Sequence, residues 1–104
     1  MNWNIVISPT AQKQLAHISD RRISHSIENT IDSLETEPTR KGKPLIGDLA
    51  GYRSIRTVGQ RYRVIFKLYY DQNTVYIASV GIRKDGDKND VYAIARKLVK
   101  AGLL

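Results

Sequence analysis

The stretch that decides the fold is residues 52–80, YRSIRTVGQRYRVIFKLYYDQNTVYIASV. It is rich in β-branched and aromatic residues, which favour strands, and short turns interrupt it near residues 59–60 and at residues 71–73. The composition therefore predicts three strands, over residues 52–56, 62–70 and 74–80. Because both connections are short, we expect each strand to run antiparallel to the next.

The middle strand indicates which side of the sheet faces the core. Alternate side chains of a strand point to opposite faces. One face carries Tyr62, Val64, Phe66, Leu68 and Tyr70, and the other carries Arg61, Arg63, Ile65 and Lys67. We therefore expect Tyr62, Phe66 and Tyr70 to pack in the core.

A strand and two helices are predicted before these strands. The strand spans residues 3–8, after which Ser8 and Pro9 provide the N-cap and the first residue of a helix that runs to about Ile18. Asp20 caps a second helix, whose apolar stripe consists of Ile23, Ile27, Ile31 and Leu34. Pro38 is expected to end this helix, because proline disfavours the helical conformation in the residue before it.

A last helix is predicted near the C-terminus. Asp90 is its expected N-cap, and an apolar stripe of Val91, Ile94, Ala95 and Leu98 precedes Gly102. The element order predicts an α+β fold in one domain, residues 1–104. An N-terminal strand and a two-helix hairpin pack on one face of a twisted antiparallel sheet, followed by a C-terminal helix. We expect the opposite face to be open to nucleic acid or a partner peptide.

Length and composition exclude several classes of protein. The 104 residues contain no Cys, so neither disulfides nor thiolate chemistry is available. The N-terminus lacks the basic and long apolar regions of a signal peptide, and the apolar runs are too short to span a bilayer. We expect a cytoplasmic protein with no membrane partner.

The charge of the chain is concentrated in its middle. Residues 39–67 carry eight Lys or Arg and one Asp, whereas residues 1–38 carry three Lys or Arg and five Asp or Glu. The formal net charge of +7 at pH 7 therefore comes from one segment. Such a segment favours a polyanion partner, either nucleic acid or an acidic protein. The alternative is a basic surface that only improves solubility.

No cofactor or metal is expected. The sequence contains neither a glycine loop that cradles phosphate nor a paired metal-ligand motif. The spacing of Asp85, Asp87 and Asp90 does not match a calcium loop and favours capping and loop solvation. His17 and His25 lie in the predicted helices, where a surface or interface role is the usual one and acid–base catalysis the alternative.

Arginine and tyrosine supply the remaining polar chemistry. Arginine forks bind phosphate and stabilise the charge that develops on it, and tyrosine stacks on a base or transfers a proton. Such residues can cleave RNA without a metal: the ribose 2′-OH attacks the adjacent phosphate, and a proton passes to the 5′ leaving oxygen. The role of arginine is electrostatic, because its pKa is above about 12.

Four motifs along the chain share the pattern of one family. They are Leu45-x-Gly47 with Tyr52-Arg53-Ser54-Ile55-Arg56, then Arg61-Tyr62-Arg63-Val64-Ile65-Phe66, then Val80-Gly81-x-Arg83, then Val91-Tyr92. Together they resemble the RelE/ParE superfamily of bacterial toxins, over about residues 5–98. The resemblance implies a toxin that an antitoxin wraps and neutralises.

The two branches of this superfamily differ in their target. RelE-like members cleave mRNA in the ribosomal A site, whereas ParE-like members poison DNA gyrase. The late Tyr92 favours the RelE branch. The resemblance therefore implies a ribosome-dependent mRNA endoribonuclease, with a non-nuclease gyrase inhibitor as the alternative. A basic interaction module without toxicity is the third hypothesis.

The resemblance also assigns catalytic residues. Arg63 and Arg83 match the positions that stabilise the scissile phosphate, and Tyr92 matches the residue that stacks on a base or transfers a proton. Each has a structural alternative: a surface ion pair for Arg63, a salt bridge with Asp85 or Asp87 for Arg83, and packing on the sheet for Tyr92.

RNA-binding residues are expected around them. These residues are Lys43, Arg53, Arg56 and Arg61. Arg53 matches the first member of a basic pair that the RelE branch carries on the preceding strand. A strict alignment places Ile55 at the second position, so Arg56 would reach the site through a β-bulge caused by an extra residue in the hairpin loop.

The expected partners are an antitoxin, the ribosome and mRNA. Because the net charge is +7, we expect a largely acidic antitoxin segment that associates fast and salt-dependently, forming a hetero-oligomer. It should add a helix or a strand over the exposed sheet face and cover Arg63 or Arg83.

Overall fold

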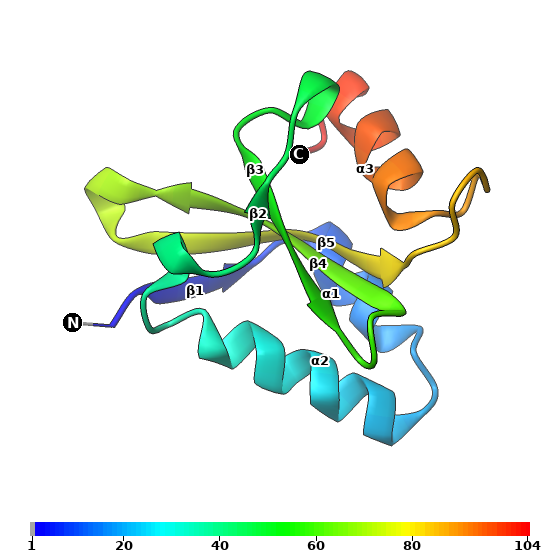
Figure 1. Ribbon diagram of the computed structural model, residues 1–104, viewed down its shortest axis with the longest axis horizontal. Helices are drawn as coiled ribbons and strands as arrows, with labels where there is room; N and C mark the ends of the chain where they lie inside the picture. Colours follow the sequence, from blue (N-terminus) through cyan, green and yellow to red (C-terminus); the bar gives the residue numbers. More distant parts are fainter. Residues whose placement is uncertain (1) are drawn as a thin grey trace.

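The computed structural model describes residues 2–104, and Met1, the first residue of the predicted domain, lies outside the described residues. Five strands form one sheet in the order β1-β5-β4-β3-β2 (Figure 1). The strands are β1 (Asn4–Ile7), β2 (Lys43–Pro44), β3 (Tyr52–Thr57), β4 (Tyr62–Tyr69) and β5 (Thr74–Ile82). The helices are α1 (Pro9–Ala16), α2 (Arg21–Ser33) and α3 (Val91–Lys100).

The sheet confirms the predicted antiparallel order of three consecutive strands. β3 pairs with β4 and β4 pairs with β5, both antiparallel. Two features of the sheet differ from the expectation. β1 lies parallel to β5, so the sheet is mixed, and a two-residue strand that was not predicted, β2, lies beside β3. The fold is therefore α+β with a largely antiparallel sheet.

Side-chain caps fix where each helix begins. The Oγ of Ser8 accepts a hydrogen bond from the backbone N–H of Ala11 at 3.0 Å, and Pro9 occupies the first helical position. Asp20 accepts from the first turn of α2 in the same way. Asp90 caps α3. All three predicted caps are therefore confirmed. The end of α2 differs, because the helix stops at Ser33, before Pro38.

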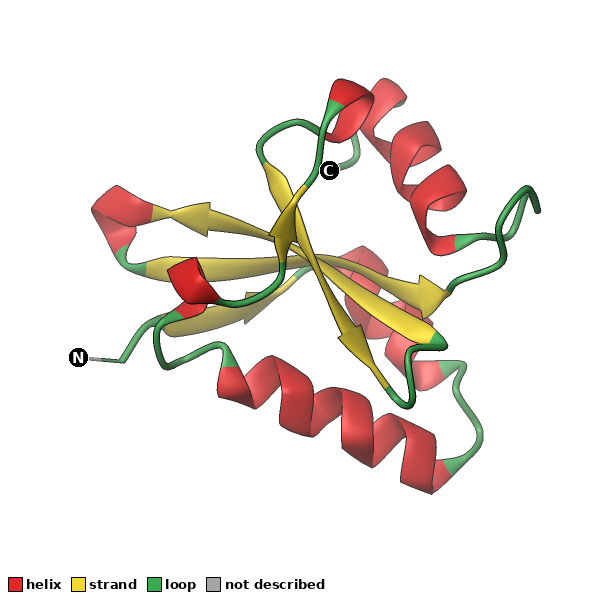
Figure 2. Ribbon diagram, in the orientation of Figure 1, coloured by secondary structure: helices red, strands yellow, loops and turns green. Residues whose placement is uncertain are grey.

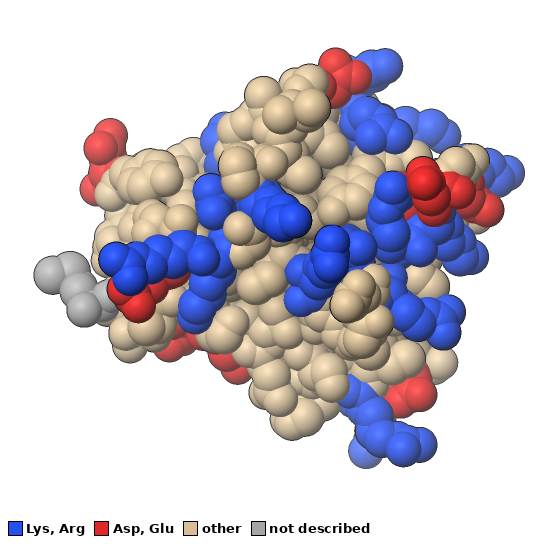
Figure 3. All heavy atoms as spheres, viewed as in Figure 1, with Lys and Arg blue, Asp and Glu red and all other residues tan. Residues whose placement is uncertain are grey.

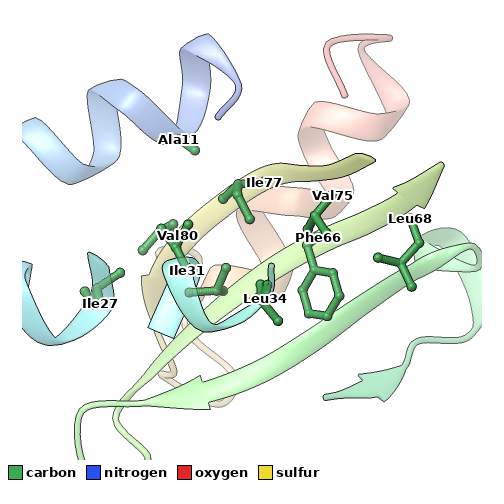
Figure 4. Packing of buried hydrophobic residues seen from close by; sticks show 10 residues of the cluster. Ala11, Ile27, Ile31, Leu34, Phe66, Leu68, Val75, Ile77 and Val80 are labelled. Carbon is green, nitrogen blue, oxygen red and sulfur yellow. The ribbon is translucent and has the colours of Figure 1, made fainter. Parts of the chain in front are cut away.

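One face of the sheet is closed by α1 and α2. Ile27 and Ile31 of α2, and Leu34 at its C-cap, are buried against the sheet, as the apolar stripe predicts. Figure 4 shows them pointing toward β4 and β5, where Phe66 is fully buried beneath α2. This cluster is the larger of the two apolar cores.

The other face is partly covered by α3, where the sequence suggested an open surface. Val91 and Ala95 of α3 are buried against Ile65 and Ala78 of the sheet. Figure 2 shows α3 across the sheet from α2. Gly81 permits this approach, because a Cβ at that position would lie 3.2 Å from Cγ2 of Val91. The helices therefore sit on both faces.

The predicted core residues of β4 have different environments. Phe66 is fully buried, as expected, and Tyr62 is half-buried. Tyr70 is 65% exposed because the chain leaves the strand at Tyr69 and enters a short 3-10 turn, Tyr70–Gln72. The assignment of Tyr70 to the core was wrong, since the alternation ends with the strand.

Among residues 2–104, no helix is long and apolar enough to cross a membrane.

Candidate functional site

An open groove of about 630 Å³ lies on the α3 side of the sheet, between β3 and α3. Its charged and hydroxyl-bearing lining residues are Lys43, Ser54, Arg56, Arg63, Arg83 and Tyr92. Figure 3 shows Lys and Arg atoms gathered over the middle of this view and beside α3. The groove therefore collects residues of separate elements into one basic surface.

Two arginines of the groove are direct cross-strand neighbours. Arg56 of β3 pairs with Arg63 of β4 in the register of the hairpin. Like charges placed directly opposite are unfavourable, so this pair does not serve the stability of the sheet. The Arg63 guanidinium donates to the carbonyl oxygens of Gln60 and of Tyr62, the latter at 3.1 Å. It contacts its own hairpin instead of forming the surface ion pair considered above.

Arg83 directly follows β5 and also lines the groove. Its Nη1 lies 2.7 Å from Oδ1 of Asp90, and its Nη2 lies 3.3 Å from Oδ1 of Asp85. Its guanidinium carbon sits 5.0 Å from the ring centroid of Tyr92, within the range of a cation–π contact. The loop salt bridge with Asp85, which was the structural alternative to a catalytic role, exists together with a shorter one to Asp90.

Asp90 joins the cap of α3 to this arginine. The carboxylate is buried and also accepts from the backbone N–H groups of Lys84 at 2.6 Å and of Tyr92 at 3.0 Å. Burial alone would raise the pKa of Asp90, but the hydrogen bonds from Arg83 and from the two backbone groups outweigh it, so the pKa lies below its usual value. The same bond raises the pKa of Arg83. Both groups are ionised at neutral pH.

Tyr92 is the second residue of α3 and lines the groove. The phenol oxygen lies 2.7 Å from the Oγ of Ser54 on β3, in a bond for which either hydroxyl is the donor. Its ring also packs against the apolar cluster beneath α3. Tyr92 therefore both packs against the apolar cluster and lines the groove.

The family is decided by a sequence comparison. A family model described as the ParE toxin of the type II toxin–antitoxin system parDE matches residues 5–86. The chain belongs to the RelE/ParE toxin family of type II toxin–antitoxin systems. Toxin RelG of Mycobacterium tuberculosis is 32% identical over 85 residues, which cover 82% of this chain and 95% of that protein.

Solved structures agree with this assignment. The RelBE2 toxin–antitoxin complex of Mycobacterium tuberculosis matches at 30% identity with a TM-score of 0.72, over 80% of this chain and 100% of that chain. A double arginine-to-alanine mutant of the toxin RelE from E. coli, in the free state, matches at 13% identity with a TM-score of 0.73, over 100% of both chains. The second match shows the fold alone.

The toxin does not bring every predicted RNA-binding residue into the groove. Arg53 lies on the opposite face of β3, where its guanidinium donates to the backbone carbonyl oxygens of Lys41 at 3.0 Å and of Gly42 at 3.3 Å. Arg61 lies in the exposed hairpin turn, outside the groove lining. Lys43 and Arg56 are the two members of that set that line the groove.

Arg56 reaches the groove by regular strand alternation. The β3–β4 register is uninterrupted from Tyr52 to Thr57, so the β-bulge expected to bring Arg56 there was wrong. Ser54 and Arg56 are two residues apart and share a face. The irregularity of the sheet instead lies between β4 and β5, near Ile65 and Phe66.

Ser54 is the groove residue that sequence reasoning missed. It is 7% exposed, and its partner Tyr92 is 38 positions later in the chain. A signal existed in the alternation of β3, because any residue two positions from Arg56 must share its face.

The histidines lie elsewhere, since neither His17 nor His25 lines the groove. Within residues 2–104, no three His, Asp or Glu side chains form a cluster suited to a metal ion.

Proposed function

We propose that this toxin is a ribosome-dependent mRNA endoribonuclease that inhibits translation in the cytoplasm. One observation carries the proposal: Arg56 of β3, Arg63 of β4, Arg83 of the loop after β5 and Tyr92 of α3 line a single open groove. Three guanidinium groups around one phenol suit a phosphodiester in RNA. The similarity to toxin RelG supports the toxin class.

The reaction balances without a metal. The 2′-oxygen of a ribose forms a bond to the adjacent phosphorus, and the bond from phosphorus to the 5′-oxygen of the next nucleotide breaks. The products are a 2′,3′-cyclic phosphate and a 5′-hydroxyl. One proton leaves the 2′-OH and one is delivered to the 5′-oxygen.

The arginines act on the negative charge of this transition state. Arg63 and Arg83 both line the groove and bind the phosphate oxygens as the charge grows, while Arg56 and Lys43 hold the flanking backbone. Arginine stays protonated because its pKa is above about 12. We therefore assign one of the two proton transfers to the Tyr92 hydroxyl.

The ribosome supplies what the groove lacks. The groove lining, as the described residues form it, contains no histidine or carboxylate that could act as a second acid–base group. Holding the 2′-OH in line with the scissile bond is then a large part of the catalysis, and a ribosome-bound mRNA arrives already oriented. Cleavage of free RNA should be slow for this reason.

The test is primer extension on a defined mRNA in a cell-free translation system with purified toxin. New 5′ ends inside the reading frame, absent without ribosomes, would support the proposal. Arg63→Ala and Tyr92→Phe should remove these ends. Arg40→Ala is the matched control, because Arg40 is exposed, pairs with Glu37 at 3.7 Å and lies outside the groove. Intact mRNA with normal translation would contradict the nuclease.

Inhibition of DNA gyrase is the second candidate. The observation in its favour is that the matching family model is that of the ParE toxin. A supercoiling assay with purified gyrase separates the two functions, because an mRNA endoribonuclease leaves supercoiling unchanged. Loss of supercoiling together with intact mRNA would replace the first proposal by the second.

We also propose an acidic antitoxin that covers the groove. The net charge of +7 and the three groove arginines favour such a segment. The RelBE2 match is itself a toxin–antitoxin complex, and so is the matching intact RelBE complex of E. coli. Co-purification and hydrogen exchange of the complex test the idea: protection should appear at Arg63 or Arg83, and a complex that leaves both exposed would contradict it.

A further inference from the structure

The hydrogen bond between Ser54 and Tyr92 has no role in the reaction described so far. Ser54 is 7% exposed, and its Oγ lies 2.7 Å from the phenol oxygen of Tyr92. The bond joins β3 to the first turn of α3, and both residues line the groove. It is the contact that places the Tyr92 hydroxyl in the groove.

Tyr92 is held at three points. Its backbone N–H donates to Oδ2 of Asp90 at 3.0 Å, its ring lies beneath the Arg83 guanidinium at 5.0 Å, and its hydroxyl meets Ser54. The first two contacts fix the start of the helix and the face of the ring. Only the third acts on the oxygen that carries the proton.

A serine is chemically suited to this task. Its hydroxyl has one proton to donate and two lone pairs to accept, so it can accept from a phenol and donate to a phenolate. An arginine or lysine at this place could donate to the phenol oxygen but has no acceptor for the hydrogen bond that the phenol donates. The contact therefore persists in both protonation states of Tyr92.

We propose that Ser54 is the positioning residue for Tyr92: it holds the phenol oxygen in the groove and keeps its hydrogen bond while the proton moves. The inference rests on the proposed nuclease function and deepens it. Ser54 makes no bond to the phosphate in this scheme, and it acts through Tyr92.

The experiment compares single-turnover cleavage of ribosome-bound mRNA by the parent and by Ser54→Ala. We expect the maximal rate to fall about 10- to 100-fold, because a reacting group released from its geometry loses about that much. The toxin concentration for half-maximal rate should stay unchanged, since the arginines that bind RNA remain. Ser54→Thr retains a hydroxyl and should restore the rate.

Non-additivity separates positioning from a general structural effect. Tyr92→Phe and the double variant Ser54→Ala/Tyr92→Phe should be equally slow, because Ser54 has nothing to position once the hydroxyl is gone. Thr57→Val is the matched control. Thr57 is also on β3, is also 7% exposed and also forms a 2.7 Å bond to a helix hydroxyl, that of Thr30, but on the opposite face. It should leave the cleavage rate unchanged.

A rate for Ser54→Ala equal to that of the parent, or full additivity with Tyr92→Phe, would overturn the proposal. A second readout needs no activity: in protein labelled with ¹³C at tyrosine, the hydroxyl proton of Tyr92 should exchange with water faster in Ser54→Ala. Unchanged exchange would also overturn the proposal. If the parent does not cleave mRNA but exchange increases, the nuclease function fails and the positioning contact stands.

Discussion

The two faces of the sheet use the same strands for opposite purposes. On the α1/α2 face, Val64 and Phe66 are fully buried in the larger apolar cluster. On the α3 face, the neighbouring residues Arg63 and Ile65 divide between the groove and a smaller apolar cluster. One face therefore stabilises the fold, and the other, only half covered by its helix, presents the site.

Arginines show the same contrast within one strand. Arg53 faces the closed side and satisfies backbone carbonyl oxygens of the preceding loop, at 3.0 Å for Lys41. Arg56, three residues later, faces the groove. Because a strand alternates with a period of two, an odd spacing always separates two residues in this way. Residue type alone does not tell a structural arginine from a functional one.

The largest expected loss of stability is on the closed face. Phe66 and Ile65 are adjacent in β4, both fully buried, and point to opposite faces. Phe66→Ala should lower the free energy of unfolding by about 3–5 kcal/mol, and Ile65→Ala by a value nearer the lower end of the ~2–5 kcal/mol range for such residues. Urea unfolding measures both. An equal or larger loss for Ile65→Ala would mean that the α3 face stabilises the fold at least as much as the α1/α2 face.

The largest expected loss of activity is on the groove face. Arg63→Ala should slow cleavage of ribosome-bound mRNA by about 100- to 1,000-fold, the usual effect of removing one group that stabilises transition-state charge. The free energy of unfolding should change by less than about 1 kcal/mol, because the side chain lies at the surface of the hairpin. Single-turnover kinetics and urea unfolding on the same preparation give the two values. A parallel loss of both would place Arg63 with the structural residues.

Asp90 serves both the stability of the fold and the groove, because it caps α3 and forms a salt bridge with Arg83. Its pKa is lower in the folded chain than its ordinary value of 3.8, so its ionised form stabilises the fold above that pH. Asp90→Asn keeps an N-cap residue and should cost about 1–3 kcal/mol at neutral pH through the loss of charged hydrogen bonds. The difference from the parent should disappear as the pH falls through 3.8 and then through the lower folded value.

Urea unfolding across this acidic range tests the linkage. A difference between parent and Asp90→Asn that stays constant with pH would show that the carboxylate charge does not stabilise the fold. The matched control is Asp85→Asn. Asp85 pairs with the same arginine at 3.3 Å but its side chain is 92% exposed, so its replacement should change the free energy of unfolding by less than about 1 kcal/mol.

The smallest expected effects distinguish Arg53 from Arg56. Arg53→Ala should cost about 1 kcal/mol of unfolding free energy through its lost hydrogen bonds and leave the salt dependence of RNA binding unchanged. Arg56→Ala should leave the free energy of unfolding unchanged. It should reduce the slope of log K against log salt by about one. Binding to stalled ribosome–mRNA complexes at several salt concentrations measures this slope. Equal slopes for both variants would mean that Arg56 makes no phosphate contact.

Local chemistry made most of the fold predictable. Ser8, Asp20 and Asp90 cap their helices as their residue types predict, and the stripe of α2 faces the core. Patterns of this kind depend on neighbours within a few positions. What the sequence did not reveal depends on distant partners: β1 pairs in parallel with β5, and α3 lies across the sheet from α2. Gly81 was a signal of that approach, but its partner Val91 is only evident in three dimensions.

The candidate site shows the same limit. The motifs pointed to Arg63, Arg83 and Tyr92, and these do line one groove, although their roles remain predictions. Alignment by residue type selected Arg53 for the groove and overlooked Ser54, because strand faces follow from register and not from similarity. The carboxylate of Asp90 was read only as a cap, and its bond to Arg83 at 2.7 Å depends on how the loop between them folds back.

The pairing of β1 with β5 also governs when the toxin takes shape during synthesis. Asn4 lies opposite Thr74, so the first strand of the chain waits for the last before its backbone is paired. Tyr92 follows all five strands along the chain. The groove therefore cannot assemble until the chain has been made through Tyr92, whereas α1 and α2 emerge early without a sheet to cover. A ribosome must make the chain through the first turn of α3 before this protein possesses the surface that we propose acts on ribosomes.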